Sequence, residues 1–359
     1  MYNLLRPLLF RLEPEQAHAL TVQALRLAGY VPPARWILNL LFYTKPKPVQ
    51  VFGLTFKNPI GLAAGYDKDG VAVRGLSSLG FGHVEVGTVT PLAQEGNPKP
   101  RVFRLVEDEA VINRMGFPGL GAAYVEKQLR SYRLWETGSS LAGDWFSRIS
   151  KPKKRSNMIL GVNLGKNKST PNEEAVLDYL ALAQNFSPYA DYLTINISSP
   201  NTVGLRQLQG KQALEGLLVQ IHEQRKLEEA DLQKRLPILV KLAPDLSDAE
   251  LDDAIEVIVN SKMDGVIVTN TTLAREGLRS DSRGETGGLS GSPLRVRSEA
   301  VLRQTVKRVN GQVPVVSAGG VMNPDDVKRR LDDGAALVQV YTGLIYRGPA
   351  LVQQIVKSL

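Results

Sequence analysis

The stretch Tyr192–Thr202, YLTINISSPNT, decides the fold class of this 359-residue chain. A short apolar strand ends there in a run of amides and hydroxyls, a pattern typical of parallel strands whose carboxyl ends carry a site. Seven further segments have the same form, and amphipathic stretches such as 172–186 and 247–260 separate most of them. The eight strand candidates are Pro59–Ala64, His83–Val89, Ile159–Leu164, Tyr192–Ile197, Ile238–Leu242, Gly265–Thr269, Val315–Ala318 and Leu337–Tyr341.

This alternation predicts an α/β fold, a (β/α)8 TIM barrel, since the units recur over about 300 residues. A doubly wound sheet is the alternative, but no strand candidate runs into the G-x-G-x-x-G turn of dinucleotide-binding folds. The G-x-x-x-G-K run at Gly161–Lys166 is one residue short of a P-loop and lacks its Ser or Thr.

Residues 1–46 predict a small N-terminal helical domain, and 47–359 predict the barrel. Helices are expected over 14–28 and 33–43, and the second has almost no polar face. Such a helix is buried in protein or in lipid, so the domain is either a cap on the barrel or a membrane-dipping module. No apolar stretch approaches the roughly 18 residues of a spanning helix, and no cleavage site follows the N-terminus, so we expect an unprocessed, cytosol-facing chain.

The net charge of +8 is confined to two segments. Residues 1–50 and residues 131–158 each hold six basic and two acidic side chains, so the charges of the remaining residues cancel. The same segments hold the three tryptophans, Trp36, Trp135 and Trp145. Two basic segments in an otherwise neutral chain favour contact with anionic lipid or nucleic acid. The alternative is that both are solvent-exposed segments without a partner.

The chain contains no cysteine, which excludes a disulfide framework, a thiolate metal site and a cysteine nucleophile. The three histidines, His18, His83 and His222, are widely spaced in the sequence. We therefore expect no bound metal.

The polar residues at the strand ends indicate the kind of ligand. Amides and hydroxyls dominate, with Lys68 and Lys241 but no pair of carboxylates. Amides and hydroxyls suit a neutral ring with alternating donors and acceptors, and Lys68 would neutralise a carboxylate. The glycines of 287–291 and 319–320 can present backbone N–H groups to a phosphate. A phosphate site beside a lysine among amides favours flavin mononucleotide (FMN).

The sequence also resembles class 2 dihydroorotate dehydrogenases, the membrane-associated, quinone-dependent members of that family. The resemblance covers nearly the whole chain except about 131–158. It rests on the order and combination of the motifs LTFKNPIGLAAGYDKDG, GFGHVEVGTVTP, NPKPRVFRL, INRMGF, GVNLGKNK, NISSPNTVGLR, VKLAPDLS, DGVIVTNTT, TGGLSG and LVQVYTGLIYRGP.

The resemblance implies FMN-dependent oxidation of (S)-dihydroorotate to orotate, with a quinone as electron acceptor, in de novo pyrimidine (UMP) biosynthesis. It implies that Ser199 is the base that removes the C5 proton while a hydride passes from C6 to the flavin N5, and Thr202 is our candidate for the proton relay. The residues matching FMN contacts are Ala64, Gly65, Thr88, Asn163, Asn196, Lys241, Thr269, Gly291, Gly320, Tyr341 and Thr342. Those matching dihydroorotate contacts are Lys68, Asn113, Arg114, Met115, Gly116, Phe117, Asn196, Asn201, Asn270 and Thr271.

The same resemblance gives the N-terminal domain a role. His18 and Arg104 match positions that meet the quinone in a tunnel, and Tyr341 lies between tunnel and flavin. It implies a peripheral membrane protein on the cytoplasmic face of a bacterial cell membrane, with lipid rather than nucleic acid as its partner.

Residues 131–158 do not fit the family and form a predicted insertion. They join a helix to the third barrel strand, at the end of a barrel opposite the active site, so we expect no direct part in catalysis. Two other functions stay open on the residues alone. One is a flavin barrel that acts on pyrimidines in RNA, such as a dihydrouridine synthase, and the other is a non-catalytic protein that binds lipid or nucleic acid.

Overall fold

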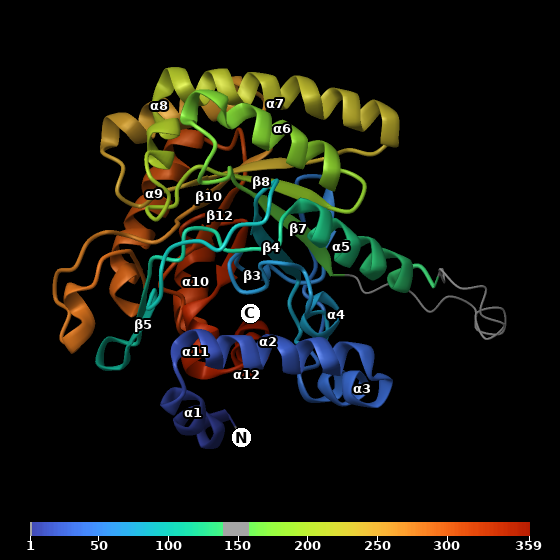
Figure 1. The fold of residues 1–359 in the computed structure, drawn as a ribbon, viewed down its shortest axis with the longest axis vertical. Helices are drawn as coiled ribbons and strands as arrows, with labels where there is room; N and C mark the ends of the chain where they lie inside the picture. The colour runs from blue at the N-terminus through green and yellow to red at the C-terminus, as the bar shows by residue number, and fades with distance from the viewer. Residues whose placement is uncertain (1, 139–157) are drawn as a thin grey trace.

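The computed structural model describes residues 2–138 and 158–359. Its centre is a closed parallel barrel with the strand order β10-β12-β13-β3-β4-β7-β8-β9 (Figure 1). The barrel strands are β3 (Ile60–Leu62), β4 (His83–Val89), β7 (Ile159–Leu164), β8 (Tyr192–Asn196), β9 (Ile238–Leu242), β10 (Gly265–Val268), β12 (Val315–Ala318) and β13 (Leu337–Val340). Each lies within the segment predicted for it, and the predicted (β/α)8 barrel is confirmed.

The helices surround the barrel because each buries one apolar stripe against the strands. They are α4 (Val73–Leu76), α5 (Ala122–Glu136), α6 (Ala175–Phe186), α7 (Lys211–Leu232), α8 (Asp248–Asn260), α9 (Arg295–Val309), α10 (Pro324–Asp332), α11 (Thr342–Arg347) and α12 (Ala350–Ser358). Every residue of β4 is buried, as expected for a strand covered on both faces. Helix α8 begins with a capping box in which the Ser247 side chain accepts from the Glu250 N–H, and the Glu250 carboxylate accepts from the Ser247 N–H.

Two small antiparallel sheets lie outside the barrel. A hairpin of β1 (Val49–Val51) and β2 (Leu54–Phe56) packs Phe52 and Phe56 against residues at the start of the barrel strands. A second sheet joins β5 (Val102–Leu105), β6 (Ala110–Asn113) and β11 (Gly288–Gly291). This second sheet was not predicted from the sequence, because it pairs segments about 175 residues apart in the chain.

Three helices form the N-terminal module: α1 (Tyr2–Arg11), α2 (Pro14–Tyr30) and α3 (Pro32–Leu41). Helices α2 and α3 agree with the predicted ones, whereas α1 was not predicted because Pro7 lies inside it. The module lies along one side of the barrel, against α4, α11 and α12 (Figure 1).

Glycines allow α2 to approach the barrel closely. A Cβ on Gly75 of α4 would lie 2.1 Å from the carbonyl oxygen of Leu25, and one on Gly29 would lie 2.6 Å from the Gly75 nitrogen. A salt bridge of 2.9 Å between Glu15 and Arg101 adds a second link to the barrel. The module is therefore packed against the barrel at several points.

Most of the predicted insertion 131–158 lies outside the described residues. Its described beginning is the end of α5, where the Trp135 ring lies under two guanidinium groups. Arg35 of α3 is 4.8 Å and Arg74 of α4 is 5.3 Å from the ring centroid. Trp135 thus connects α5 to the N-terminal module.

Candidate functional site

A cavity of about 860 Å³ runs from the carboxyl ends of the barrel strands to the N-terminal module. Its inner part is lined by Asn196, Lys241 and Thr269, which lie at or next to the carboxyl ends of three neighbouring strands. Its outer part is lined by Leu5 and Leu9 of α1, His18 of α2 and Leu41 of α3, among others. The cavity therefore links the expected catalytic end of the barrel to helices outside it.

Most of the predicted site residues line this cavity. They are Ser199, Ala64, Gly65, Thr88, Asn196, Lys241, Thr269, Gly320, Tyr341, Thr342, Lys68, Asn113, Met115, Gly116, Phe117, Asn201, Asn270, Thr271, His18 and Arg104. Four others do not line it: Asn163, Gly291, Arg114 and Thr202.

The amides at the strand ends form a connected network. Asn163 accepts a hydrogen bond from Thr88 Oγ1 at 2.6 Å and another from Asn196 Nδ2 at 3.0 Å. Asn270 Nδ2 lies 3.4 Å from Asn196 Oδ1 and 3.0 Å from the Ser198 hydroxyl oxygen. Asn163 therefore lies beneath the cavity wall, where it is hydrogen-bonded to Thr88 and Asn196, which line the cavity.

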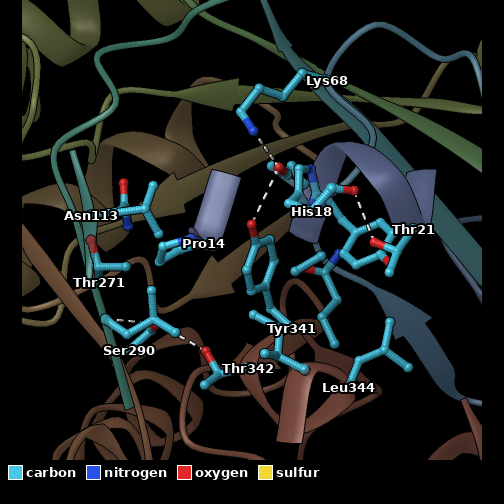
Figure 2. A pocket seen from close by; sticks show the side chains of 18 of the residues that line it. Pro14, His18, Thr21, Lys68, Asn113, Thr271, Ser290, Tyr341, Thr342 and Leu344 are labelled. Carbon is cyan, nitrogen blue, oxygen red and sulfur yellow. Dashed lines mark hydrogen bonds between the residues drawn. The ribbon is translucent and has the colours of Figure 1, made fainter. Parts of the chain in front are cut away.

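Lys68 and Tyr341 point at a common oxygen from opposite sides (Figure 2). The Lys68 ammonium donates to the Gly65 carbonyl at 2.8 Å, and the Tyr341 hydroxyl donates to the same oxygen at 3.3 Å. Burial lowers the pKa of Lys68 to about 8. At neutral pH the lysine is thus a cation in the cavity wall, with ammonium protons left for a ligand.

Two buried polar atoms in the cavity wall have no hydrogen-bond partner among the described residues. They are Thr269 Oγ1 and Gln339 Oε1, and both residues are almost fully buried. An unpaired buried polar atom costs about 1–3 kcal/mol, so such atoms in a cavity wall indicate a polar ligand.

A loop of positive-φ glycines follows β12. Gly319 has φ +98° and Gly320 has φ +72°, and a Cβ on Gly320 would lie 2.4 Å from Arg295 Cα. The buried Arg330 side chain donates to the Gly319 carbonyl at 2.6 Å and to Ser317 Oγ at 2.8 Å. Only glycine fits this loop, which explains the G-G pair after β12.

Ser199 and Thr202 lie in the loop after β8, and both are buried. Ser199 Oγ accepts the Asn201 N–H at 3.3 Å and lines the cavity. Thr202 Oγ1 has no hydrogen-bond partner among the described residues. The loop is tethered by Arg206, which donates to the Ser198 carbonyl at 3.0 Å and pairs with Asp245 at 2.9 Å.

The segment after β6 contributes Asn113, Met115, Gly116 and Phe117 to the cavity. Arg114 turns away instead and forms a 2.5 Å salt bridge with Glu285. Its guanidinium also lies 4.6 Å from the Phe103 ring centroid. The side chain of Arg114 is therefore used to hold the segment, and does not reach the cavity.

His18 and Arg104 both face the outer cavity. Burial, with Lys68 nearby, lowers the pKa of His18 to about 3, so its imidazole is neutral at physiological pH. Arg104 donates to the carbonyls of Leu9 and Leu12, and its guanidinium lies 4.7 Å from the Phe10 ring centroid. Arg104 thus also holds the end of α1 against β5.

Several residues of the site were missed by the sequence analysis. The Tyr66 ring lies between His18, at 5.1 Å, and Tyr341, at 6.2 Å, measured between centroids. Ser290 of β11 lines the cavity and accepts from Thr342 Oγ1 at 2.8 Å (Figure 2). Glu85 and Gln339 lie inside the barrel; Glu85 is the one acidic residue of β4, and Gln339 is the one polar residue of β13. An acidic or amide side chain inside a buried strand was the available signal for these two.

Among the described residues, no three acidic or histidine side chains are grouped so as to hold a metal ion. No helix in 2–138 or 158–359 combines the length and apolarity needed to cross a bilayer.

A parallel barrel with an amide-lined cavity at its carboxyl end is a ligand-binding (β/α)8 barrel with the geometry of an enzyme. The family model for dihydroorotate dehydrogenase matches residues 48–359. The chain belongs to the dihydroorotate dehydrogenase family, and the resemblance inferred from its motifs is confirmed.

Relatives match over the whole chain. Dihydroorotate dehydrogenase (quinone) of Idiomarina loihiensis is 45% identical over 360 residues, covering 100% of both chains. The protein of the same name from Flavobacterium lutescens is 46% identical, covering 100% of this chain and 96% of that one. The ligand-free dihydroorotate dehydrogenase structure from Eimeria tenella is 39% identical with a TM-score of 0.82, covering 96% of this chain and 93% of that one. The ferulenol complex of the Eimeria enzyme has a TM-score of 0.80 at 39% identity, covering 96% of this chain and 90% of that one.

Proposed function

We propose that this protein oxidises (S)-dihydroorotate to orotate and passes the electrons to a membrane quinone, as a step in de novo pyrimidine biosynthesis. The observation that carries the proposal is the continuous cavity from the amides at the strand ends to the apolar N-terminal module. A polar substrate and an apolar electron acceptor can use its two ends.

The cofactor we propose is FMN. Thr269 Oγ1 and Gln339 Oε1, which have no partner in 2–138 or 158–359, suit a ring with polar edges. The glycine loop at Gly319 and Gly320 suits a phosphate. The residues proposed to hold it are Ala64, Gly65, Thr88, Asn163, Asn196, Lys241, Thr269, Gly291, Gly320, Tyr341 and Thr342. When bound, FMN supplies a hydride acceptor and a store of two electrons.

The proposed substrate site adjoins Ser199. Lys68 would pair with the substrate carboxylate, and the amides of Asn113, Asn201 and Asn270 would meet the ring edge. Met115, Gly116, Phe117 and Thr271 complete the wall, while Arg114 would act by positioning the segment.

Ser199 would take the proton from C5 of the substrate, and Thr202 would pass it on. A serine hydroxyl is a weak base, so it requires a dry site and an outlet for the proton. Burial of Ser199 supports this assignment, as does the Thr202 hydroxyl, which has no hydrogen-bond partner within the described part of the chain.

The quinone would enter between the N-terminal helices, past His18 and Arg104. Thirteen of the 22 exposed large hydrophobic side chains in the described residues lie within residues 2–43. They include Leu4 and Leu8 of α1 and Trp36 and Leu40 of α3. An apolar surface of this kind supports peripheral contact with a membrane, which we place on the cytoplasmic face of the cell membrane.

A spectroscopic experiment tests the whole proposal. The purified protein should be yellow, dihydroorotate should bleach the flavin absorbance, and a quinone added afterwards should restore it. Protein that neither contains nor takes up flavin would refute the proposal, as would a flavin that dihydroorotate leaves oxidised.

A further inference from the structure

We propose that the buried carboxylate of Glu85 fixes which way the amides of Asn163, Asn196 and Asn270 point, and so acts as a positioning residue for the substrate site. The inference rests on the proposed function, because it concerns the affinity of that site for orotate. Glu85 lies on β4 inside the barrel, is fully buried and does not line the cavity.

The Glu85 carboxylate is held by four donors. Tyr192 Oη at 3.0 Å, Thr194 Oγ1 at 3.2 Å and Gln339 Nε2 at 3.0 Å all bond to Oε2. The other oxygen, Oε1, accepts from Asn163 Nδ2 at 2.8 Å. The carboxylate is the acceptor in all four hydrogen bonds, so Asn163 turns its NH2 group inward.

The orientation of the Asn163 amide determines that of Asn196, which in turn determines that of Asn270. With Nδ2 inward, Asn163 presents Oδ1 to Thr88 and Asn196. Asn196 must then give Nδ2 to Asn163, which leaves its own Oδ1 to accept from the Ser198 N–H at 3.3 Å. Asn270 in turn directs Nδ2 at Asn196 and accepts the Thr271 N–H on Oδ1 at 2.8 Å.

The series ends in the cavity, because Asn196, Asn270 and Thr271 line it. An amide that flips exchanges a donor for an acceptor at the ligand, and each mismatched buried group costs about 1–3 kcal/mol. The Glu85 carboxylate, at the inner end of this series of amides, therefore determines the donor and acceptor pattern that a bound pyrimidine meets.

Glu85→Gln is predicted to reverse the series. Gln339 Nε2 and two hydroxyls donate at one side of the carboxylate, so we expect the new carbonyl oxygen on that side and the new NH2 group toward Asn163. Two NH2 groups cannot bond to each other, so Asn163 flips, and Asn196 must follow.

The charge matters for a separate reason. Burial lowers the pKa of Lys241, and Glu85 counteracts this effect. Glu85→Gln also removes the charge that acts on Lys241, and the neutron measurement described below locates the amide deuterons in the unaltered enzyme, where that charge is kept. Tyr192→Phe is the matched control. It removes one donor to Glu85 but leaves the Glu85 carboxylate as the acceptor for Asn163.

The test compares orotate affinity by calorimetry in the FMN-loaded enzyme, with FMN content and melting temperature measured beside it. Glu85→Gln should weaken orotate binding about tenfold or more, while Tyr192→Phe stays within about threefold of the wild type. Equal losses in Glu85→Gln and Tyr192→Phe, or unchanged affinity in Glu85→Gln, would overturn the proposal. A wild type that does not bind orotate would instead refute the proposed function.

A measurement on the unaltered protein covers the case in which Glu85→Gln does not fold. Neutron diffraction from deuterated wild-type enzyme with orotate bound locates the amide deuterons directly. Asn163 should carry its deuterons toward Glu85, and Asn196 should carry them toward Asn163. Deuterons of Asn163 directed away from Glu85 would overturn the proposal.

Discussion

Ser199 is placed for a role that its chemistry alone does not favour. A serine hydroxyl has little basicity, and in the described residues its oxygen accepts only a 3.3 Å hydrogen bond from the Asn201 N–H. Its burial at the edge of the cavity and the nearby unpaired Thr202 hydroxyl are what support it as the base. The proposal thus depends on the position of the serine in the fold.

Ser199→Ala should slow flavin reduction by dihydroorotate about 100-fold or more, because general-base help acts in the transition state. Orotate affinity should change less than about threefold, since the change removes one small hydroxyl. Stopped-flow absorbance measures the reduction and calorimetry measures the binding. An unchanged reduction rate would assign the base to another residue.

Lys68 should make orotate binding depend on pH. Its pKa is lowered to about 8 by burial, so the ammonium that pairs with a carboxylate is present below that pH and lost above it. We expect the Kd of orotate to rise toward about tenfold per pH unit once the pH exceeds the Lys68 pKa. Titrations from about pH 6 to about pH 9 test this. Lys68→Gln should bind weakly with no such rise, and a similar rise in that variant would contradict the assignment.

At the scale of elements, the loops after the strands carry the site and the helices fix the loops. The loop after β12 is held from below by Arg330 of α10, and Gly320 packs against the start of α9. Two elements thus determine the shape of one proposed phosphate cradle. The strand only brings the loop to the correct end of the barrel.

Gly320→Ala should abolish tight FMN binding and cost about 2 kcal/mol or more of stability. The new Cβ would lie 2.4 Å from Arg295 Cα, at a φ of +72°. FMN content and thermal unfolding measure the two effects. Gly311→Ala is the matched control, because its φ is +76° but a Cβ there meets nothing within 4 Å. It should cost about 1 kcal/mol and keep FMN, and a Gly320→Ala protein with full FMN content would contradict the cradle.

At the scale of the whole molecule, the apolar surface is unevenly distributed. The exposed hydrophobic side chains gather on the N-terminal module, at the outer end of the cavity. Trp36 and Leu40 of α3 are 65% and 63% exposed. Contact with lipid would cover this surface and bring the cavity mouth to the layer in which quinones dissolve.

Trp36→Asp/Leu40→Asp should weaken binding to anionic phospholipid vesicles about tenfold or more, because two large apolar groups no longer enter the bilayer. Flavin reduction by dihydroorotate in solution should be unchanged, since neither residue lines the cavity. Vesicle co-sedimentation measures the binding. Leu177→Asp on α6, at a side chain 60% exposed, is the control and should bind vesicles like the wild type. Equal binding by all three proteins would count against membrane contact through α3.

The sequence by itself determined the barrel, because every parallel strand in a barrel is buried on both faces and leaves a short apolar run. It also placed Asn196, Lys241 and Thr269 together, since the carboxyl ends of such strands must meet. Local pattern could not predict the sheet of β5, β6 and β11, whose partners lie far apart in the chain. Nor could it show that Arg114 turns away from the cavity. Only the tertiary structure assigned the lone Glu85 of β4 its four donors, because a hydrogen bond across a barrel depends on which strands close it.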